Sequence, residues 1–385
     1  MDDPETQAIR HMYQSDLSSF VGLAFRLLYP GVSYQLHWST QVVAEALFRC
    51  YRRETKRLII NMPPRSLKSV CASVAFPAWI LALRPETKIL CVAGHRGLAD
   101  DHHVLTRSLM SHPKYRALFP HVRFSETATK ISLPHGGSRS AFTPTGALTG
   151  RGADLIIIDD PQAAHEVDDQ AKSTAVRNWY DRNIYQRLDD KEGGVIILVM
   201  QRLSHDDLTA HLVSHGGWEL LSLPAIATED ERFPRVFGDR VIRKKGEALN
   251  PAREDRAQLR EAMLQMGAQA FRAQYQQDPY PPGEGGPRGG AFHQVLETKD
   301  GECKYSSVFL TVISEETFLL ERLFGEFSGI RPGPPPITRE EWRESIDRCE
   351  KERAALKSAQ LGKGTNGLSH VPESGTSSLL ESKGS

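Results

Sequence analysis

A lysine and a serine stand at the end of a short loop that follows an apolar run. The apolar run covers 58–60, and the loop from 63 to 69 reads PPRSLKS. A strand, a loop and a helix start in this order present free backbone N–H groups and a helix dipole to an anion. The ammonium and hydroxyl would bind nucleotide phosphates and Mg²⁺. The predicted phosphate-binding residues are Pro64, Arg65, Ser66, Leu67, Lys68 and Ser69.

This loop departs from the usual phosphate-loop pattern, G-x-x-x-x-G-K-S/T, at both glycines. Met62 and Leu67 stand where that pattern has glycine. Leu67 is the more serious change, because glycine at this place lets the backbone approach a phosphate closely. A surface loop that holds a lysine and a serine by chance is the alternative interpretation.

Two acids end a second apolar run. Residues 155–158 read LIII, and Asp159 and Asp160 follow them. Acids at the carboxyl end of a central parallel strand would lie beside the phosphate loop. Asp159 would hold Mg²⁺, directly or through water, and Asp160 would orient or deprotonate the attacking water. An acidic turn before Pro161 is the alternative, but the two patterns in this order favour nucleotide binding.

Three more polar residues extend this candidate site. Gln201 and Arg202 follow the apolar run 194–200 and could contact the γ-phosphate. Arg151 precedes the acidic strand and could act on a neighbouring subunit as an arginine finger, or contact a DNA phosphate. Exposed strand-end residues and a solvated loop arginine are the alternatives.

Two histidine pairs suggest a metal site that the rest of the sequence does not complete. His102 and His103 are adjacent, and His211 and His215 are four residues apart on a predicted helix. Neither pair has a fitting third ligand, so we expect surface histidines.

The elements that must position these residues alternate between two patterns. Apolar strand-like runs lie at 58–60, 88–93, 154–158, 194–200 and 218–223, and helical patterns lie at 68–83, 98–110, 168–188 and 205–213. Continuous apolar strands between helices predict an α/β fold with a mostly parallel sheet covered by helices. Pro77 should kink or interrupt the first of these helices. A polar helix is predicted at 255–277.

The composition of the chain changes after this polar helix. Residues 280–290 are rich in proline and glycine and predict a linker without helix or strand. One strand at 308–313, a capped helix from Thr338 and a Ser/Gly-rich tail from 362 follow. We therefore predict a domain at 1–282, a linker at 283–290, and a poorly structured C-terminal appendage at 291–385.

Charge and cysteine content exclude several classes of protein. The chain of 385 residues has 48 Lys+Arg and 48 Asp+Glu, which excludes a polybasic protein but allows a local basic face. Its five cysteines are widely spaced and form no CxxC pair, which argues against a disulfide framework or a zinc knuckle. Acids near the N-terminus and the absence of a long apolar run predict no signal peptide and no membrane span. A reducing cytoplasm fits best.

The chain resembles the large terminase subunit of tailed phages and prophages, the ATPase motor that packages DNA. The likeness runs from about Tyr34 to Pro282 and includes RLIINMPPRSLKS, TGALTGRGADLIIIDDP, VMQRLSHDDL and FRAQYQQDP. It implies an additional-strand P-loop ATPase fold that binds ATP and Mg²⁺. The implied partners are double-stranded DNA, a small terminase subunit and a portal ring, on which the chain would self-associate into a ring in the bacterial host cytoplasm. Gln35 and His37 lie where the family contacts adenine.

The resemblance also implies roles for the loop and the acidic strand. Lys68 and Ser69 would hold phosphate and Mg²⁺, and Asp159 would be the acid on the metal side. Asp160 takes the place of the usual catalytic glutamate.

Four further residues receive roles in the same way. Arg65 and Arg151 become the candidate arginines for sensing the γ-phosphate, within or between subunits. Gln201 and Arg202 become the motif that couples hydrolysis to the rest of the molecule.

The family also implies a nuclease after the ATPase, and this chain lacks the pattern for it. An RNase H-like nuclease needs several acids that converge at strand ends to hold two metals. After Pro282 only Glu315 and Glu316 follow a candidate strand, and a solvated turn explains them as well. We therefore expect a truncated or diverged nuclease region without nuclease activity.

The leading hypothesis is thus an ATP-dependent motor subunit for packaging double-stranded DNA into phage capsids. The alternative is a catalytically impaired prophage remnant that binds DNA or terminase partners without turnover. A helicase-like ATPase is disfavoured, because no second motor-core repeat follows.

Overall fold

The computed structural model describes most of the chain and divides it into two units. The described residues are 4–34, 37–146, 150–166, 169–233, 241–281, 288–292, 295–297, 303–305, 309–313 and 319–325. The first unit comprises 1–289 and 311–328, and the second comprises 290–310 and 329–385. All the predicted site residues lie in the first unit.

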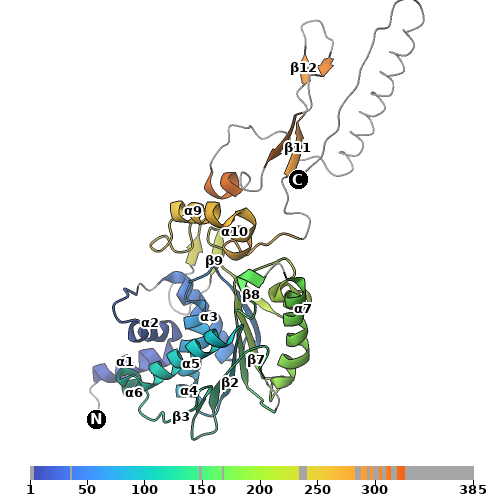
Figure 1. The fold of residues 1–385 in the computed structure, drawn as a ribbon. Helices are drawn as coiled ribbons and strands as arrows, with labels where there is room; N and C mark the ends of the chain where they lie inside the picture. The colour runs from blue at the N-terminus through green and yellow to red at the C-terminus, as the bar shows by residue number, and fades with distance from the viewer. Residues whose placement is uncertain are drawn as a thin grey trace, which may run out of the picture. The chain divides into compact units, whose positions relative to one another are not determined.

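An eight-stranded sheet forms the centre of the first unit (Figure 1), in the order β3-β4-β5-β2-β6-β7-β1-β8. Its strands are β1 (Arg57–Asn61), β2 (Lys88–Ala93), β3 (Ser125–Glu126), β4 (Lys130–Ser132), β5 (Ser138–Phe142), β6 (Leu155–Asp159), β7 (Val195–Met200) and β8 (Glu219–Ser222). Six neighbouring strands of the sheet are parallel, namely β5, β2, β6, β7, β1 and β8. Strand β4 is antiparallel to both of its neighbours. The predicted α/β fold with a mostly parallel sheet is confirmed.

The position of β7 gives this sheet its topology. β7 pairs with β1 on one side and with β6 on the other, so it separates the strand before the phosphate loop from the acidic strand. This arrangement is the additional strand that the sequence resemblance implies.

Helices cover both faces of the sheet, because successive residues of a strand point to opposite faces. On β1, Leu58 and Ile60 face one apolar cluster and Ile59 faces another. Figure 1 shows the N-terminal helices on one side of the sheet and α7 on the other. The helices of the first side are α1 (Pro4–Ser15), α2 (Leu17–Leu28), α3 (Trp38–Tyr51), α4 (Phe76–Leu83), α5 (Arg96–Ser111) and α6 (Pro113–Leu118), and those of the second are α7 (Gln170–Trp179) and α8 (Leu208–Ser214).

A π-helical turn separates the phosphate loop from α4. This turn, η1 (Val70–Ala75), ends where the backbone N–H of Phe76 donates to Cys71 O, five residues back. Pro77 is the second residue of α4, and it has no backbone N–H to donate to the helical turn that precedes it. The helix predicted at 68–83 is therefore continuous, and it changes type one residue before the proline.

The polar segment predicted as one helix at 255–277 forms two helices, so that prediction is wrong. They are α9 (Arg256–Met266) and α10 (Ala268–Gln274). Gly267 between them has a φ of 85°, a left-handed conformation that ends a right-handed helix. Leu319 and Leu323 pack against α9 and α10 in a third apolar cluster, although they fall in the segment that the sequence assigns to the appendage.

The remaining elements are short. They are η2 (Ala164–Glu166), η3 (Tyr180–Ile184), η4 (Tyr185–Arg187), β9 (Glu231–Phe233), β10 (Val241–Arg243), β11 (Arg288–Phe292), β12 (Val295–Glu297), β13 (Cys303–Tyr305), β14 (Phe309–Ile313) and η5 (Leu320–Phe324). β14 lies where a strand was predicted. β11 begins at Arg288, so the prediction that the stretch 280–290 contains no helix or strand is wrong.

Several predicted features lie outside the described residues. They are Gln35, Pro282, the acids Glu315 and Glu316, the helix from Thr338 and the Ser/Gly-rich tail. Within the described residues, every helix is too short or too polar to cross a bilayer.

Candidate nucleotide-binding site

The loop after β1 has the backbone of an anion-binding nest. Arg65 and Leu67 have φ angles of 59° and 64°, whereas Ser66 and Lys68 are not left-handed. Left- and right-handed residues in alternation turn successive N–H groups toward one point. The backbone N–H groups of residues 65–67 donate to no acceptor in the described part of the chain. The loop is therefore shaped to receive an anion.

Leu67 takes the backbone conformation that glycine favours at this place. A leucine in the left-handed region costs about 1–2 kcal/mol. Its half-buried side chain packs against the apolar cluster on the first face of the sheet, which offsets part of that cost. The leucine thus changes the energy of the loop rather than its shape.

Four predicted residues meet at the carboxyl ends of β1 and β6. Lys68 Nζ lies 3.2 Å from Asp160 Oδ2, and the Ser69 hydroxyl donates to Asp159 Oδ1 at 3.0 Å. The side chains of Lys68 and Asp159 are 6% and 1% exposed, whereas that of Asp160 is 29% exposed. These four residues were predicted to form one site, and the structure places them in contact as two pairs.

Buried polar groups behind Asp159 hold it in place, and the sequence did not predict them. The Ser73 hydroxyl donates to Asp159 Oδ2 at 2.6 Å, and His102 Nδ1 lies 3.7 Å from the same oxygen. Arg139, fully buried on β5, donates to Ser73 O at 3.1 Å. Asp159 is therefore fixed by contacts to both of its oxygens.

The prediction that His102 and His103 are surface histidines is wrong. Both are buried on the face of α5 that packs against the sheet. His103 contacts Thr127 O at 3.0 Å through Nε2 and Arg139 at 3.4 Å through Nδ1. Two adjacent histidines do not indicate burial in a sequence, because the polar groups that allow their burial come from other segments of the chain.

Burial dominates the electrostatics of these groups. Burial raises the pKa of the Asp159 carboxyl, although the Ser73 hydrogen bond and the charge of Lys68 lower it in part. Burial also raises the pKa of Asp160, against the lowering effect of Lys68. Burial, with the charge of Arg139, lowers the pKa of His102 to about 4, so this imidazole is neutral at physiological pH.

A close backbone approach sets the position of Asp160. Its φ is 41°, its N–H donates to Val199 O at 2.9 Å, and its Oδ1 accepts from the N–H of Gln201 at 3.3 Å. A Cβ atom on Gly94, just after β2, would lie 2.3 Å from Asp160 O. Only glycine at position 94 leaves room for Asp160. A single glycine after a strand is not a distinctive pattern, so Gly94 was not singled out from the sequence.

A cleft of about 940 Å³ opens in front of the loop. Its lining includes residues 65–70, Asp160, and residues 250 and 252–254. Phe25, Tyr29 and Tyr34 line it too, with ring centroids 4.9 and 5.1 Å from Phe25 to the two tyrosines. The cleft therefore joins an anion-binding loop to an aromatic surface and has the volume of a small-molecule site.

Two other predicted residues lie outside this lining. His37 caps α3, contacts Ser39 through Nδ1 at 2.8 Å, and lines an adjoining cavity of about 70 Å³ that shares several lining residues, Arg253 among them, with the large cleft. Arg151 is exposed, with its guanidinium carbon 4.9 Å from the centre of the Phe142 ring. Arg65, in contrast, is exposed and lines the large cleft.

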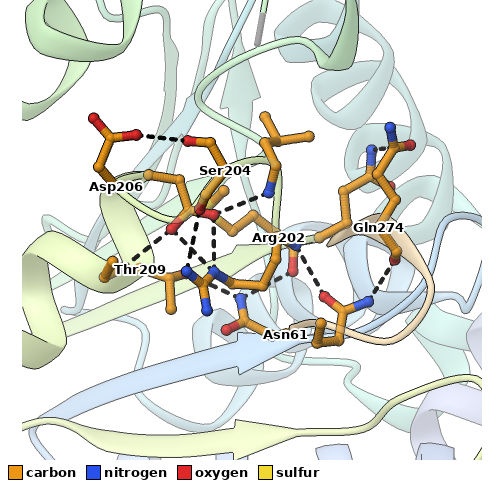
Figure 2. A network of polar contacts seen from close by, with 12 residues as sticks. Asn61, Arg202, Ser204, Asp206, Thr209 and Gln274 are labelled. Carbon is orange, nitrogen blue, oxygen red and sulfur yellow. Dashed lines mark hydrogen bonds and ion pairs between the residues drawn. The ribbon is translucent and has the colours of Figure 1, made fainter. Parts of the chain in front are cut away.

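Gln201 and Arg202 belong to a polar network (Figure 2) that joins β7 to α8 and α10. Gln201 Nε2 lies 3.5 Å from Gln274 Oε1, and the N–H of Arg202 donates to Gln277 Oε1 at 2.9 Å. Arg202 Nε donates to both oxygens of the fully buried Asp207, at 3.0 and 2.8 Å. The charge of Arg202 is thus neutralised within the protein. The sequence predicted these two residues but not their partners.

Asn61 extends the same network to the strand before the phosphate loop. Figure 2 shows its side chain near Arg202, and its amide donates to Met200 O at 3.2 Å and to Thr209 Oγ1 at 3.1 Å. The ends of β1 and β7 are therefore linked by side chains as well as by the sheet.

The donor set at Ser69 and Asp159 fits Mg²⁺ bound together with a nucleotide. Among the described residues, no group of three His, Cys, Asp or Glu side chains could hold a metal ion alone. Mg²⁺ in phosphate-loop enzymes keeps several waters and takes phosphate oxygens, one serine or threonine hydroxyl and an acid. The Ser69 hydroxyl and Asp159 carboxylate, 3.0 Å apart, supply the two protein groups.

Comparison with known proteins finds remote structural likenesses. No family model and no curated protein sequence matches the chain. The chain is similar to the large terminase of bacteriophage HK97, with 16% identity and a TM-score of 0.37 over 55% of this chain and 44% of that one. It is also similar to a variant of the ATPase domain of the large terminase of Thermus phage P74-26, with 15% identity and a TM-score of 0.41 over 65% of this chain and 95% of that one.

The matched region spans less than half of the HK97 chain. Likenesses at these TM-scores carry no argument about function, which depends instead on the geometry of the site.

Proposed function

We propose that this chain is a Mg²⁺-dependent ATPase and the motor subunit that moves double-stranded DNA into a phage capsid. The observation that carries the proposal is the nest at 65–68 beside Asp159 and Asp160. Four groups needed for phosphoryl transfer lie together at the carboxyl edge of a parallel sheet, where such folds bind ligands. The resemblance of the sequence blocks to large terminase subunits supports DNA as the substrate that is moved.

The loop residues would bind the triphosphate. The free N–H groups of residues 65–67 would donate to phosphate oxygens, and Lys68 would exchange its contact with Asp160 for the β- and γ-phosphates. Ser69 would ligate Mg²⁺, and Asp159 would accept from Ser69 or from a metal-bound water. When bound, Mg²⁺ would neutralise charge that develops on the phosphates.

Asp160 would then act on the attacking water. Lys68 lowers the pKa of Asp160 in the nucleotide-free arrangement, so its departure toward phosphate would make the carboxylate more basic. The carboxylate is partly exposed in the cleft, where it can accept a hydrogen bond from water. Its backbone and Oδ1 remain fixed by Val199 and Gln201.

Gln201 would couple this reaction to the rest of the domain. Its N–H contacts Asp160, and its side chain contacts Gln274 at the end of α10. A displacement of Asp160 during turnover would therefore be transmitted to α10 through two hydrogen bonds.

The resemblance to large terminases supports the remaining partners. They are a small terminase subunit, a portal ring and other copies of this chain in a ring, in the cytoplasm of the bacterial host. Arg151 is exposed and bonded to no acid among the described residues, so it is free to act on a neighbouring subunit or a DNA phosphate.

Phosphate release by the purified chain tests the proposal. We expect Mg²⁺-dependent release from ATP that rises when double-stranded DNA is added. The matched control is Lys68→Ala, which removes the ammonium and should remove both the basal and the stimulated rate. DNA binding without phosphate release by the parent would instead favour an impaired remnant.

A further inference from the structure

Two arginines from different segments of the chain line the cleft, and neither has an anionic partner among the described residues. Arg65 belongs to the phosphate loop, and Arg253 belongs to the turn before α9. Neither guanidinium makes a hydrogen bond or ion pair within the described part of the chain. Other arginines of this region are engaged: Arg243 with Glu231, Arg256 with Gly246 O, and Arg272 with Asp278.

The wall that carries Arg253 is preformed. The N–H groups of Arg253 and Glu254 both donate to Asn250 O, at 3.0 and 2.9 Å. The Tyr275 hydroxyl donates to the Glu254 carboxylate, and Tyr275 O accepts from the N–H of Ala225 at 2.7 Å. The backbone at Arg253 is therefore anchored, while its side chain is left free.

The charges that line the cleft do not balance within the protein. Arg65, Lys68 and Arg253 face it, against Asp160 and Glu254. Lys68 is paired with Asp160, and Glu254 accepts a hydrogen bond from Tyr275. The two free guanidiniums leave a positive field that suits a ligand with more than one negative charge.

We propose that Arg253, which lies outside the phosphate loop and lines the same cleft, binds the terminal phosphate of the nucleotide. This inference rests on the proposed function. It adds a residue that would bind the triphosphate more tightly than the diphosphate. A guanidinium suits this role, because its planar donors match two phosphate oxygens.

The same wall adjoins the network at the end of β7. Tyr275, which holds Glu254, directly follows Gln274, and Gln274 contacts Gln201. When Arg253 binds phosphate, the effect would therefore reach Gln274, which contacts Gln201 and, through it, Asp160. Hydrolysis, which removes the terminal phosphate, would release that engagement.

Calorimetry with two nucleotides tests this role on the full chain. A non-hydrolysable ATP analogue and ADP are titrated, with Mg²⁺, into the parent, Arg253→Ala and Arg253→Lys. We expect Arg253→Ala to weaken binding of the analogue by about 10- to 100-fold, the size of one charged hydrogen-bonded contact. Binding of ADP should change less than about twofold. Arg253→Lys should recover part of the loss, because it keeps the charge without the planar fork.

The matched control is Arg116→Ala, which removes an exposed guanidinium on α6, outside the lining of the cleft. It should behave like the parent. The thermal midpoint of Arg253→Ala should equal that of the parent, since the side chain has no partner in the described structure.

Three results would overturn the assignment. Unchanged binding of the analogue would mean that Arg253 makes no contact with the nucleotide. An equal loss for both nucleotides, or a lowered thermal midpoint, would mean that it acts on a shared part of the ligand or on the fold. If the parent binds neither nucleotide, the proposed function itself fails, and this inference fails with it.

Discussion

The ends of β6 and β7 lie side by side, and their polar residues are held in opposite ways. Asp160 has one ion pair, 3.2 Å long, a raised pKa and a place in the cleft. Arg202 has two bonds to the fully buried Asp207 and another to Ser204 O. A strand end does not by itself supply chemistry. The charge must also be left partly unsatisfied toward a cavity, as it is at Asp160 and is not at Arg202.

The largest effect is expected at the reactive end, from Lys68→Ala. The ammonium is buried between the nest and Asp160, so its loss should lower the hydrolysis rate by at least about 100-fold. Phosphate release with and without DNA measures this. A variant that retains the parent rate would remove the phosphate loop from the mechanism.

Asp160→Asn should separate binding from turnover. Loss of a general base costs about 10²- to 10⁴-fold in rate, whereas the amide keeps the shape of the residue and should keep ATP affinity. Calorimetry and phosphate release give the two quantities.

The control for Asp160 is Glu166→Gln. Glu166 contacts Lys172 at 2.7 Å and does not line the cleft, so this variant should turn over like the parent. If Glu166→Gln loses activity and Asp160→Asn keeps it, the water-orienting acid has been assigned to the wrong residue.

At the end of β7, Arg202→Met should reduce the stability of the fold more than it reduces the affinity for nucleotide. It would leave the buried Asp207 without its cation, which costs about 3–5 kcal/mol. Denaturant unfolding measures this loss. The double variant Arg202→Met/Asp207→Asn should recover part of it, because asparagine can still cap α8 without a charge. A stable Arg202→Met that cannot hydrolyse ATP would mean that Arg202 works on the nucleotide.

The stability of the parent should fall as the pH is lowered from about 6.5 to 4, in part through His102. Burial lowers the pKa of this imidazole from 6.5 to about 4, so the unfolded chain binds its proton first. A shift of this size corresponds to on the order of 3 kcal/mol. His102→Gln should therefore show a shallower acid limb in unfolding experiments across this range. The raised pKa values of Asp159 and Asp160 act in the opposite sense, but they are present in both proteins. Identical acid limbs would contradict the buried position of His102.

The smallest effect is expected from Leu67→Gly. It relieves a left-handed leucine, about 1–2 kcal/mol, and removes apolar contacts of similar size, so stability should change by less than about 1 kcal/mol. Mg-ATP affinity should rise only slightly, because the nest already exists with leucine. Leu67→Val should be clearly worse, since a β-branched residue tolerates positive φ poorly. A large gain in affinity with glycine, measured by calorimetry, would mean that the loop reshapes on binding.

The apolar pattern predicted the fold where burial comes from hydrocarbon. The strands β1, β2, β6 and β7 were found within one or two residues of their predicted bounds, because nearly every side chain in them is buried and apolar. β3 to β5 were not predicted. They are short and contain Ser, Lys and Arg139, whose burial depends on polar partners that come from elsewhere in the chain.

The candidate site shows the same division. Lys68 and Asp160 could be placed together from a motif and a strand end, since the fold brings parallel strand ends to one edge. Ser73 sits in an apolar helix and Gly94 follows an apolar strand. Arg253 lies in a polar turn remote in sequence from the loop. None of these three contributes a pattern before the fold is known.

The π turn η1 has a consequence for how this chain can vary. A π turn accommodates one residue more than the α-helix it interrupts, and each residue of an α-helix turns the chain by about 100°. Deleting one residue from 70 to 75 would let the helix become regular and would leave Ser69 and the buried Trp79 in their present relative orientation. The π turn thus absorbs one residue without rotating the loop relative to the core. Relatives of this chain should tolerate the loss of one residue there better than a deletion in the regular part of α4, which would rotate the two by about 100°.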